Sequence, residues 1–383
     1  MGSNADLGAE RGTHGRARRA DDPLWVIVLA GGQGRRLANF VRTTIGDTRP
    51  KQFCRIIGRR SMLRHTWDRA GRLVDGARVV SVITKGQEDY LKEEARQARI
   101  PGRVLVQPDD RGTGPGLLLP LLWIAHRQPD ACVAVFPADH FIWEESRFLG
   151  YVANAVIESR RRPDRVVLLG LAPDTPETDY GWIQPGAPQP RAFPRGELFT
   201  VARFIEKPEE AAARQLQATG GVWNSGVMAG TVYAFLQLLR SARPEAVEAL
   251  QIAARHFETS AGQAAMAAVY KHLPAFDFSR DVLAPGHDTL LVELARHLMW
   301  SDWGEPTRIL QVITRLEGRP ISSPRLGPVG QRCVGVGSAR EYSRRLRVIS
   351  NPGGDRKGRF PERNLYDLAN VHCSVAKEAP PRR

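Results

Sequence analysis

The stretch LWVIVLAGGQGRRL, residues 24–37, joins an apolar run directly to a loop of three glycines and two arginines. Its first five residues, 24–28, form an uninterrupted apolar run, which is typical of a buried strand. Glycine lets the backbone approach a ligand closely, and the guanidinium of arginine binds phosphate well. The stretch therefore predicts a phosphate-binding loop that follows a buried strand.

The chain alternates between strand-like and helix-like segments up to about residue 318. Apolar runs typical of strands recur at residues 78–84, 103–107, 131–136, 165–171 and 198–206. Helical stretches are found at residues 61–73, 87–98, 117–126, 146–160 and 233–270. This alternation predicts an α/β fold: a Rossmann-like, open, mostly parallel mixed sheet with helices on both faces. Ligands of such sheets bind beyond the carboxyl ends of the strands, where the glycine-rich loop would lie.

Length and composition indicate a soluble globular protein. The chain has 383 residues, of which 42% are hydrophobic and 25% charged, as is ordinary for this class. The longest nearly uncharged apolar stretch, residues 116–125, is too short to span a bilayer and contains Pro120. The four cysteines lie far apart, which argues against a structural zinc site or a disulfide framework. No secretory signal is evident, so we expect a cytoplasmic protein without a membrane segment.

The formal net charge of +14 is concentrated at the two ends of the chain. Residues 1–20 carry four arginines against two acids, and residues 319–383 carry 14 basic against five acidic residues. Both ends lack sustained periodicity, which is typical of disordered or weakly ordered tails. We therefore predict tails over residues 1–23 and 319–383 and one folded domain over residues 24–318. A basic tail could bind RNA, but a solvated appendage is the favoured interpretation.

The spacing of the glycine-rich loop excludes two familiar phosphate-binding motifs. A P-loop counted from Gly31 requires Gly and Lys where this chain has Arg36 and Leu37. A dinucleotide-binding motif counted from Gly32 requires a third glycine at Leu37. The remaining pattern, Gly-Gly-x-Gly-x-Arg-Leu, holds Arg36 at a fixed offset from the glycines, and its meaning depends on the motifs downstream.

Seven further motifs follow in order along the chain. They are RPKQF (49–53), QPDDRGTGPG (107–116), FPADH (136–140), APDTPETDYGWI (172–183), FIEKP (204–208), GVWNSGVM (221–228) and WSDWGEP (300–306). Together with the glycine-rich loop they resemble the sugar-nucleotide pyrophosphorylases, and they look most like mannose-1-phosphate guanylyltransferases. The resemblance covers residues 25–314. It implies an enzyme with a nucleotide-diphospho-sugar transferase fold.

In the family that these motifs resemble, a sugar 1-phosphate attacks the α-phosphorus of a nucleoside triphosphate and releases pyrophosphate. The attacking phosphate oxygen is already anionic near neutrality, so no general base is required. Catalysis then depends on bringing polyanions together and neutralising charge. The resemblance implies Mg²⁺ as the cofactor, and GTP and mannose 1-phosphate as the substrates. It leaves the oligomeric state open, a homo-oligomer included.

The resemblance also implies roles for individual residues. Arg36 would contact the β and γ phosphates, and Lys51 would lie against the α-phosphate and the sugar phosphate. Asp139 and Asp302 would be the catalytic carboxylates that hold Mg²⁺. Residues implied for nucleotide binding are Leu29, Ala30, Gly31, Gly32, Gly34, Gln107, Arg111, Gly112 and Thr113. Residues implied for binding the sugar phosphate are Gly181, Glu206, Lys207 and Asn224.

Four further residues have weaker or open roles. Arg35 occupies the variable position of the loop, so we expect at most a supporting role. His140 is expected to be a structural hydrogen-bonding residue rather than a catalyst. Trp223 and Trp300 are equally compatible with packing and with a platform for the sugar ring.

The choice of nucleobase depends on Gln107, which stands where many guanylyltransferases have an acid before the proline. A glutamine here also occurs in pyrophosphorylases that use UTP or dTTP, so those nucleotides with glucose 1-phosphate remain an alternative. The following RGTGPG resembles the Arg-Asn-Thr-Ala-Pro pattern of guanylyltransferases, which favours GTP. The alternative hypothesis that the protein is not an enzyme is a catalytically silent sensor that binds a nucleotide sugar.

The connection over residues 38–49 is longer than is usual in the family. It could be a lid over the nucleotide or simply a longer loop. The sequence also lacks the cupin-like and β-helical segments of bifunctional relatives, so we predict one activity.

Overall fold

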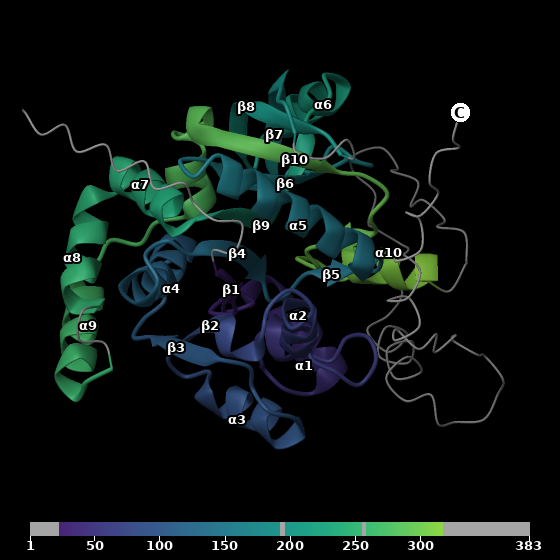
Figure 1. Ribbon diagram of the computed structural model, residues 1–383. Coiled ribbons are helices and arrows are strands. Elements are labelled where there is room, and N and C mark those ends of the chain that lie inside the picture. The colour runs from purple at the N-terminus through teal and green to yellow at the C-terminus, as the bar shows by residue number, and fades with distance from the viewer. Residues whose placement is uncertain (1–22, 192–195, 255–257, 317–383) are drawn as a thin grey trace, which may run out of the picture.

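The computed structural model describes residues 23–191, 196–254 and 258–316, and the predicted tails lie outside these ranges except for Pro23. Its main feature is a nine-stranded mixed sheet with the order β3-β2-β1-β4-β9-β6-β10-β8-β7 (Figure 1). The strands are β1 (Leu24–Leu29), β2 (Val79–Thr84), β3 (Arg103–Gln107), β4 (Cys132–Pro137), β6 (Val166–Leu171), β7 (Gly181–Pro188), β8 (Leu198–Glu206), β9 (Val222–Thr231) and β10 (Leu290–Ala295).

The central strands are buried on both faces because their apolar side chains alternate between two cores. In β1, Trp25 and Ile27 belong to one core, whereas Val26 and Val28 belong to the other. Successive side chains of a strand point to opposite faces, so a continuous apolar run such as LWVIV needs cover on both sides. The predicted α/β architecture is confirmed.

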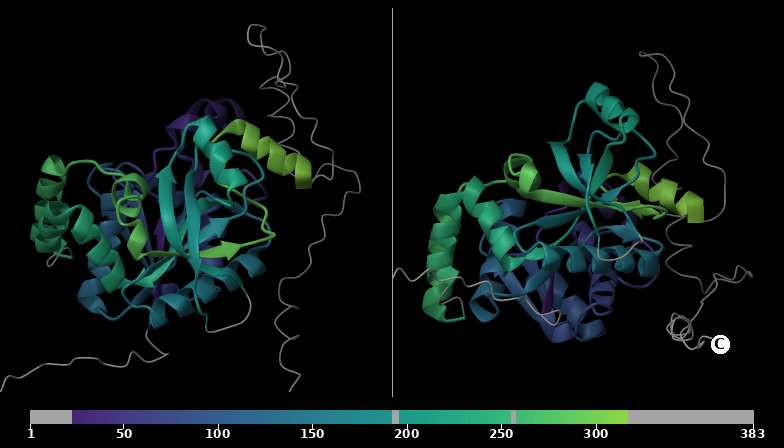
Figure 2. Two further views of the ribbon diagram at one scale, coloured as in Figure 1. Left: turned by 90° about the horizontal axis from the view of Figure 1, so that it is seen from above. Right: turned by 45° about the horizontal axis from the view of Figure 1, so that its top comes forward.

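Helices supply that cover on each face of the sheet. One face packs against α4 (Thr113–Arg127), α7 (Val232–Ala242), α8 (Pro244–Ala254) and α9 (Ser260–His272). The other packs against α2 (Met62–Ala70), α3 (Glu88–Gln97), α5 (Glu145–Arg161) and α6 (Glu210–Ala218). Figure 2 shows α7, α8 and α9 grouped at one side of the molecule, away from the yellow-green helix α10 (Pro306–Leu316). Among the described residues, no helix is both long and apolar enough to cross a bilayer.

Parallel pairing is confined to two parts of the sheet. Strand β1 runs parallel to β2 and β4, β2 to β3, and β6 to β10. Between them, β9 is antiparallel to both β4 and β6, and β7 and β8 pair antiparallel at one edge. Strands β7, β9 and β10 were not anticipated from sequence. In β7 and β9 the prolines and glycines lower intrinsic strand propensity, and pairing with neighbouring strands outweighs it.

The long connection after the glycine-rich loop is helical over residues 38–45, so its interpretation as simply a longer loop was wrong. A short 3₁₀ turn (Arg35–Leu37) leads into α1 (Ala38–Ile45). Phe40 and Val41 bury their side chains in a third core together with Trp303 and Ile309. This apolar contact joins α1 to the segment around α10, and it accounts for the helical state of the connection.

A two-stranded sheet lies beside the main one. Strand β5 (Phe141–Ile142) pairs antiparallel with β11 (Trp300–Ser301), with Trp300 opposite Ile142. Strand β5 follows Asp139 closely, and β11 directly precedes Asp302. The pairing therefore brings together the two carboxylates predicted to hold a metal.

Candidate active site

The glycine-rich loop follows β1 and is fastened by glutamine side chains. Gln52 Nε2 donates to the carbonyl oxygens of Ala30 (2.6 Å) and Gly32 (2.9 Å). Gln87 Nε2 donates to the carbonyl oxygens of Gly31 and Gly32, both at 3.2 Å. The amides of the two glycines make no hydrogen bond with any described residue. A loop whose carbonyls are bound and whose amides are free is suited to an anion.

The three glycines of the loop meet different constraints. A Cβ on Gly31 would lie 2.8 Å from Nε2 of Gln107, and one on Gly34 would lie 3.0 Å from the amide nitrogen of Lys51. Gly34 also has a φ of +63°, which side-chain-bearing residues rarely adopt. A Cβ on Gly32 would meet nothing within 4 Å. Close packing therefore requires glycine at positions 31 and 34, and leaves open space at position 32.

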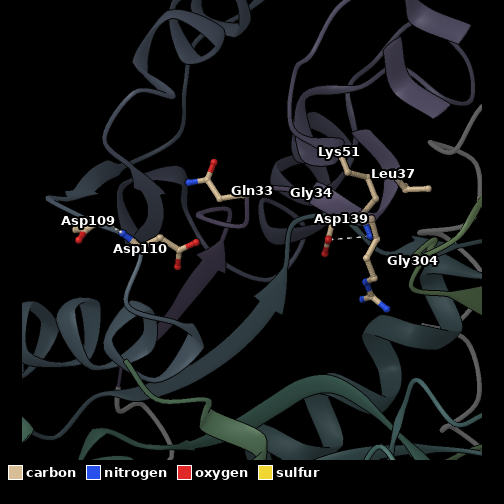
Figure 3. Close-up of a pocket in the computed structure, with 9 residues that line it drawn as sticks. Gln33, Gly34, Leu37, Lys51, Asp109, Asp110, Asp139 and Gly304 are labelled. Atoms are coloured by element: carbon tan, nitrogen blue, oxygen red, sulfur yellow. Dashed lines mark hydrogen bonds and ion pairs between the residues drawn. The ribbon is translucent and has the colours of Figure 1, made fainter. Parts of the chain in front are cut away.

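A cavity of about 580 Å³ opens beside this loop. It is lined by Gln33, Gly34, Arg36, Leu37, Lys51, Asp109, Asp110, Asp139 and Gly304. Figure 3 shows Lys51 and Asp139 joined at one side of the cavity and Asp109 and Asp110 at the other, with Gln33 between them. The elements that supply these side chains follow the carboxyl ends of β1, β3 and β4, where parallel sheets bind ligands.

Lys51 lies at the centre of the candidate site. Its side chain is buried, with 7% of the residue exposed. Its Nζ lies 2.9 Å from Oδ2 of Asp139 and donates a hydrogen bond to the backbone carbonyl of Asp302. One ammonium group thus contacts both segments that carry the predicted metal-binding carboxylates.

Nearby groups favour the ionised form of both carboxylates. Desolvation acts to raise the pKa of Asp139 and is the largest single influence, but the charge and the hydrogen bond of Lys51, together with the neighbouring His140, outweigh it and hold that pKa below its usual range. Burial opposes ionisation of Asp302 too, and Lys51 and Arg308 together lower its pKa. The described residues contain no cluster of three or more His, Cys, Asp or Glu side chains suited to a metal. Two ionised carboxylates fit Mg²⁺, which binds oxygen donors and takes its remaining ligands from water and substrate phosphates.

Arg36 points into open space at the cavity. Its side chain is 56% exposed, and its Nη1 lies 3.7 Å from Oδ2 of Asp179. An exposed guanidinium at the cavity wall is available to an incoming phosphate. The side chain of Arg35, the supporting candidate, is outside the described part of the structure.

The residues predicted to bind the sugar phosphate come together on β7, β8 and β9. A Cβ on Gly181 would lie 2.7 Å from Oε2 of Glu206 and 3.4 Å from Cβ of Asn224. Lys207 follows Glu206, has a φ of +50° and keeps its side chain 54% exposed. Asn224 Oδ1 accepts a hydrogen bond from the amide of Gly226 at 3.1 Å.

Glu206 has an unusual protonation equilibrium. Burial, followed by the nearby charge of Asp277, raises the pKa of Glu206 to about 7. The charges of Lys207 and Arg280 oppose this shift. The carboxyl group therefore changes its charge close to neutral pH.

Gln107, the residue on which the choice of base depends, is buried at the end of β3. Its Oε1 lies 3.4 Å from the hydroxyl of Tyr270, and its Nε2 lies 3.5 Å from Oγ1 of Thr84. Both contacts are long for hydrogen bonds. The amide is thus adjacent to the glycine-rich loop and only weakly held.

Three of the predicted nucleotide-binding residues, Arg111, Gly112 and Thr113, contact a segment that sequence reasoning missed, residues 276–278. The amide of Phe276 donates to the carbonyl of Arg111, and a Cβ on Gly112 would lie 2.5 Å from the carbonyl oxygen of Phe276. Thr113 Oγ1 donates to Oδ2 of Asp277 at 2.9 Å. Arg111 also pairs with Asp109, at 2.9 Å.

His140 does not have the hydrogen-bonding role predicted for it. Its Nδ1 is buried without a hydrogen-bond partner among the described residues, and its Nε2 lies 3.8 Å from Oδ1 of Asp139. Its ring instead packs edge-on against Trp300, with ring centroids 5.1 Å apart. Burial lowers the pKa of His140, so this packed ring is neutral. Trp223 also packs, against Tyr180.

Several further residues around the site were missed because their partners are distant in sequence. They are Gln87, Tyr180, Asp277 and Arg308. Tyr180 lies within a motif that was recognised, but no spacing rule indicates that its hydroxyl reaches Asp302. Arg308 is one of two arginines in α10, and nothing in the local sequence distinguishes it from the exposed Arg315.

Comparison with known proteins agrees with this geometry. The sequence profile of the nucleotidyl transferase family, described as "Nucleotidyl transferase", matches residues 25–318. The chain belongs to this family. The match spans the described sheet apart from Leu24 and includes every predicted site residue.

Individual relatives of this nucleotidyl transferase family member have names that concern mannose 1-phosphate or xanthan synthesis. The xanthan biosynthesis protein XanB of Xanthomonas campestris pv. campestris (strain B100) is 33% identical over 228 residues, which are 59% of this chain and 46% of that protein. The mannose-1-phosphate guanylyltransferase of Escherichia coli (strain K12) is 31% identical over 240 residues, 61% of this chain and 48% of that protein. The chain spans about half the length of the curated relatives it matches.

A solved structure supports the same kinship. The crystal structure of a protein described as mannose-1-phosphate geranyltransferase from Thermus thermophilus matches with a TM-score of 0.62 and 29% identity. The match covers 73% of this chain and 76% of that one. The sheet of this chain therefore has the fold of the sugar nucleotidyltransferases.

Proposed function

We propose that this protein catalyses the Mg²⁺-dependent transfer of a nucleotidyl group from GTP to mannose 1-phosphate. The products would be GDP-mannose and pyrophosphate. The observation that carries the proposal is the position of Lys51, whose Nζ contacts both Asp139 and the backbone of Asp302 beside the glycine-rich loop. The names of the relatives support the choice of sugar and nucleotide.

The reaction is a single in-line displacement. An anionic oxygen of the sugar 1-phosphate forms a bond to the α-phosphorus of the nucleotide. The bond from that phosphorus to the oxygen bridging the α and β positions breaks, and the electron pair leaves with pyrophosphate. No proton needs to move, because the attacking oxygen is already ionised near neutrality. The protein therefore needs to position and neutralise the phosphates rather than supply a base.

The residues around the cavity divide this work between them. The free amides of Gly31 and Gly32 and the guanidinium of Arg36 would hold the β and γ phosphates. Lys51 would exchange its contact with Asp139 for the α-phosphate and the incoming sugar phosphate. Mg²⁺, held by the carboxylates of Asp139 and Asp302, would supply further neutralisation of the charge that develops on the leaving group.

The cluster of Gly181, Glu206 and Asn224 is the proposed sugar site. A carboxylate accepts hydrogen bonds from hydroxyl groups, and an amide can both donate and accept. Gly181 leaves room for a ring beside Glu206. The ammonium of Lys207 is exposed and only loosely paired with Glu206, at 4.0 Å, so it could turn to the sugar phosphate.

A second candidate differs only in its substrates, and Gln107 is the observation that favours it. An amide can pair with uracil or thymine, which present both a donor and an acceptor. UTP or dTTP with glucose 1-phosphate is therefore the alternative pair. The substrates of both candidates are metabolites of the cytoplasm, where we place the enzyme.

The test is a matrix of nucleoside triphosphates and sugar 1-phosphates. The purified protein is incubated with each pair and Mg²⁺, pyrophosphate is measured, and the nucleotide sugar is identified by mass spectrometry. We expect the fastest release of pyrophosphate with GTP and mannose 1-phosphate. A preference for UTP or dTTP would overturn the base assignment alone. If the protein binds nucleotide but releases no pyrophosphate with any pair, the proposal that it is an enzyme is overturned and a silent sensor is favoured.

A further inference from the structure

Arg308 of helix α10 lies beneath the candidate metal site, with only 7% of the residue exposed. Its Nη1 donates to Oδ1 of Asp302 at 3.1 Å. Its Nη2 donates to Oε2 of Glu177 at 2.7 Å and to Oδ2 of Asp179 at 3.2 Å. One guanidinium therefore connects a predicted metal ligand to two acids of the loop that leads into β7.

Tyr180 completes this arrangement. The guanidinium of Arg308 lies over the ring of Tyr180, 4.5 Å from its centroid, and the hydroxyl of Tyr180 donates to Oδ1 of Asp302 at 3.0 Å. The amide of Gly304 donates to the same oxygen at 2.8 Å. Oδ1 of Asp302 thus accepts hydrogen bonds from a guanidinium, a hydroxyl and an amide.

The other carboxylate oxygen of Asp302 is left free. Oδ2 accepts no hydrogen bond from any described residue, although a Cβ on Gly304 would lie only 2.4 Å from it. Since donors fix Oδ1 from several directions, the carboxylate cannot rotate without breaking them. A single orientation of Asp302 follows, with Oδ2 available to a ligand.

We infer that Arg308 is a positioning residue, which orients Asp302 toward Mg²⁺ and ties the metal side of the cleft to the loop that precedes the sugar site. The inference rests on the proposed function, because it takes Asp302 as a metal ligand. Neighbours that hydrogen-bond a metal ligand fix its direction and so raise metal affinity. Through Glu177 and Asp179 the same guanidinium holds the segment that ends at Gly181, so the metal and sugar sites share one support.

The same helix provides a matched control. Arg315, also on α10, pairs with Asp174 of the same loop at 3.0 Å, with the two side chains 46% and 54% exposed. An exposed ion pair of this kind contributes little to stability. Replacing Arg315 removes a bond between the helix and the loop without touching Asp302.

The experiment compares Arg308→Met, Arg308→Lys and Arg315→Met with the wild type. Free Mn²⁺ is measured by electron paramagnetic resonance during titration of each protein with the α,β-methylene analogue of its best nucleotide present. We expect Arg308→Met to weaken Mn²⁺ binding by about 10–100-fold. Arg308→Lys should recover part of this loss, because its ammonium keeps the charge but cannot bridge the same acceptors. Arg315→Met should bind Mn²⁺ as the wild type does.

Steady-state kinetics and thermal unfolding separate positioning from a purely structural role. With Arg308→Met we expect kcat to fall and the Mg²⁺ concentration for half-maximal rate to rise, with the KM for the nucleotide nearly unchanged at saturating Mg²⁺. Wild-type Mn²⁺ affinity in Arg308→Met, whatever its melting temperature, would overturn this inference alone. Failure of the wild type to bind Mn²⁺ or release pyrophosphate would overturn the proposed function and this inference with it.

Discussion

The Nζ of Lys51 lies 2.9 Å from Oδ2 of Asp139, so the cation proposed to meet the substrate phosphates is paired with a carboxylate proposed to meet the metal. Lys51 lowers the pKa of Asp139 and so favours the charged carboxylate in the absence of ligand. Binding of a phosphate and a metal ion would replace one ion pair by two favourable contacts. The pair therefore keeps the site ready without leaving an isolated buried charge.

Replacing Lys51 should impair the reaction far more than the fold. We expect Lys51→Met to lower kcat/KM by about 10²–10³-fold, the usual cost of removing a group that stabilises charge in the transition state. Lys51→Arg should retain part of the activity because its charge remains. Pyrophosphate release measures the effect, and an active Lys51→Met enzyme would contradict the assigned role.

The carboxylates of the cavity should differ sharply in importance. Asp139→Asn and Asp302→Asn should each lower turnover by at least about 10²-fold and weaken Mn²⁺ binding, because each removes a proposed metal ligand. Asp109→Asn is the control, since Asp109 lines the same cavity but pairs with Arg111. Comparable losses of Mn²⁺ affinity in all three variants would show that the metal lies elsewhere in the cavity.

Two glycines of the loop should respond differently to an added methyl group. Gly34→Ala places a Cβ 3.0 Å from the amide nitrogen of Lys51 at a φ of +63°, and should destabilise the protein by about 1–2 kcal/mol. The Cβ of Gly32→Ala would lie in open space, so the free energy of unfolding of this variant should match that of the wild type. Its affinity for the nucleotide should be weaker. Chemical denaturation and nucleotide titration measure the two effects. Equal unfolding free energies for both variants would refute this distinction.

The affinity for the sugar 1-phosphate should depend on pH through Glu206. Its pKa is about 7, and the ionised carboxylate is the better acceptor for sugar hydroxyls. We therefore expect the KM for the sugar 1-phosphate to fall as the pH rises from about 6 to 8. The phosphate of the substrate itself ionises near pH 6, and Glu206→Gln is the control that retains only that contribution. If the KM for the sugar 1-phosphate depends on pH identically in the wild type and in Glu206→Gln, Glu206 is excluded from the sugar site.

Glu206 should also make the stability of the folded protein depend on pH. Here a higher pH is unfavourable, whereas it favours binding of the sugar 1-phosphate. Since its folded-state pKa lies above the ordinary value of 4.5, the folded protein favours the neutral carboxyl, and ionisation costs stability. The free energy of unfolding should fall as the pH rises from about 4.5 to 7, and part of that slope should vanish in Glu206→Gln. Urea denaturation at a series of pH values measures it, and a steeper slope in the variant would reverse the assignment.

The sequence allowed six of the nine strands of the main sheet, most of the helices that cover it and the family to be predicted, because these depend on local patterns and on ordered motifs. The run LWVIV, for example, needs cover on both faces wherever it is placed. The contacts that hold the site residues in place could not be predicted, because they join residues that are distant in the sequence. Gln87 fastens the glycine-rich loop from the turn after β2, more than fifty residues later in the chain, and Arg308 reaches a motif more than a hundred residues before it.

His140 illustrates a different error. It was predicted to form a structural hydrogen bond because it is polar and follows Asp139. Its ring is held by aromatic packing on Trp300, and only the three-dimensional arrangement supplies that partner. Residues 38–45 show the same limitation for secondary structure. Their helix depends on apolar contact with the segment around Trp303, which comes much later in the chain.

The short pairing of β5 with β11 has a consequence for the order in which the enzyme matures. A growing polypeptide leaves the ribosome from its N-terminus, so the glycine-rich loop, Lys51 and Asp139 emerge long before Asp302. An unfinished chain that stops before residue 300 lacks β11 and the second carboxylate. Such a chain would also lack half of the metal site proposed above. The proposed metal site is therefore complete only once β11 has been synthesised and has paired with β5.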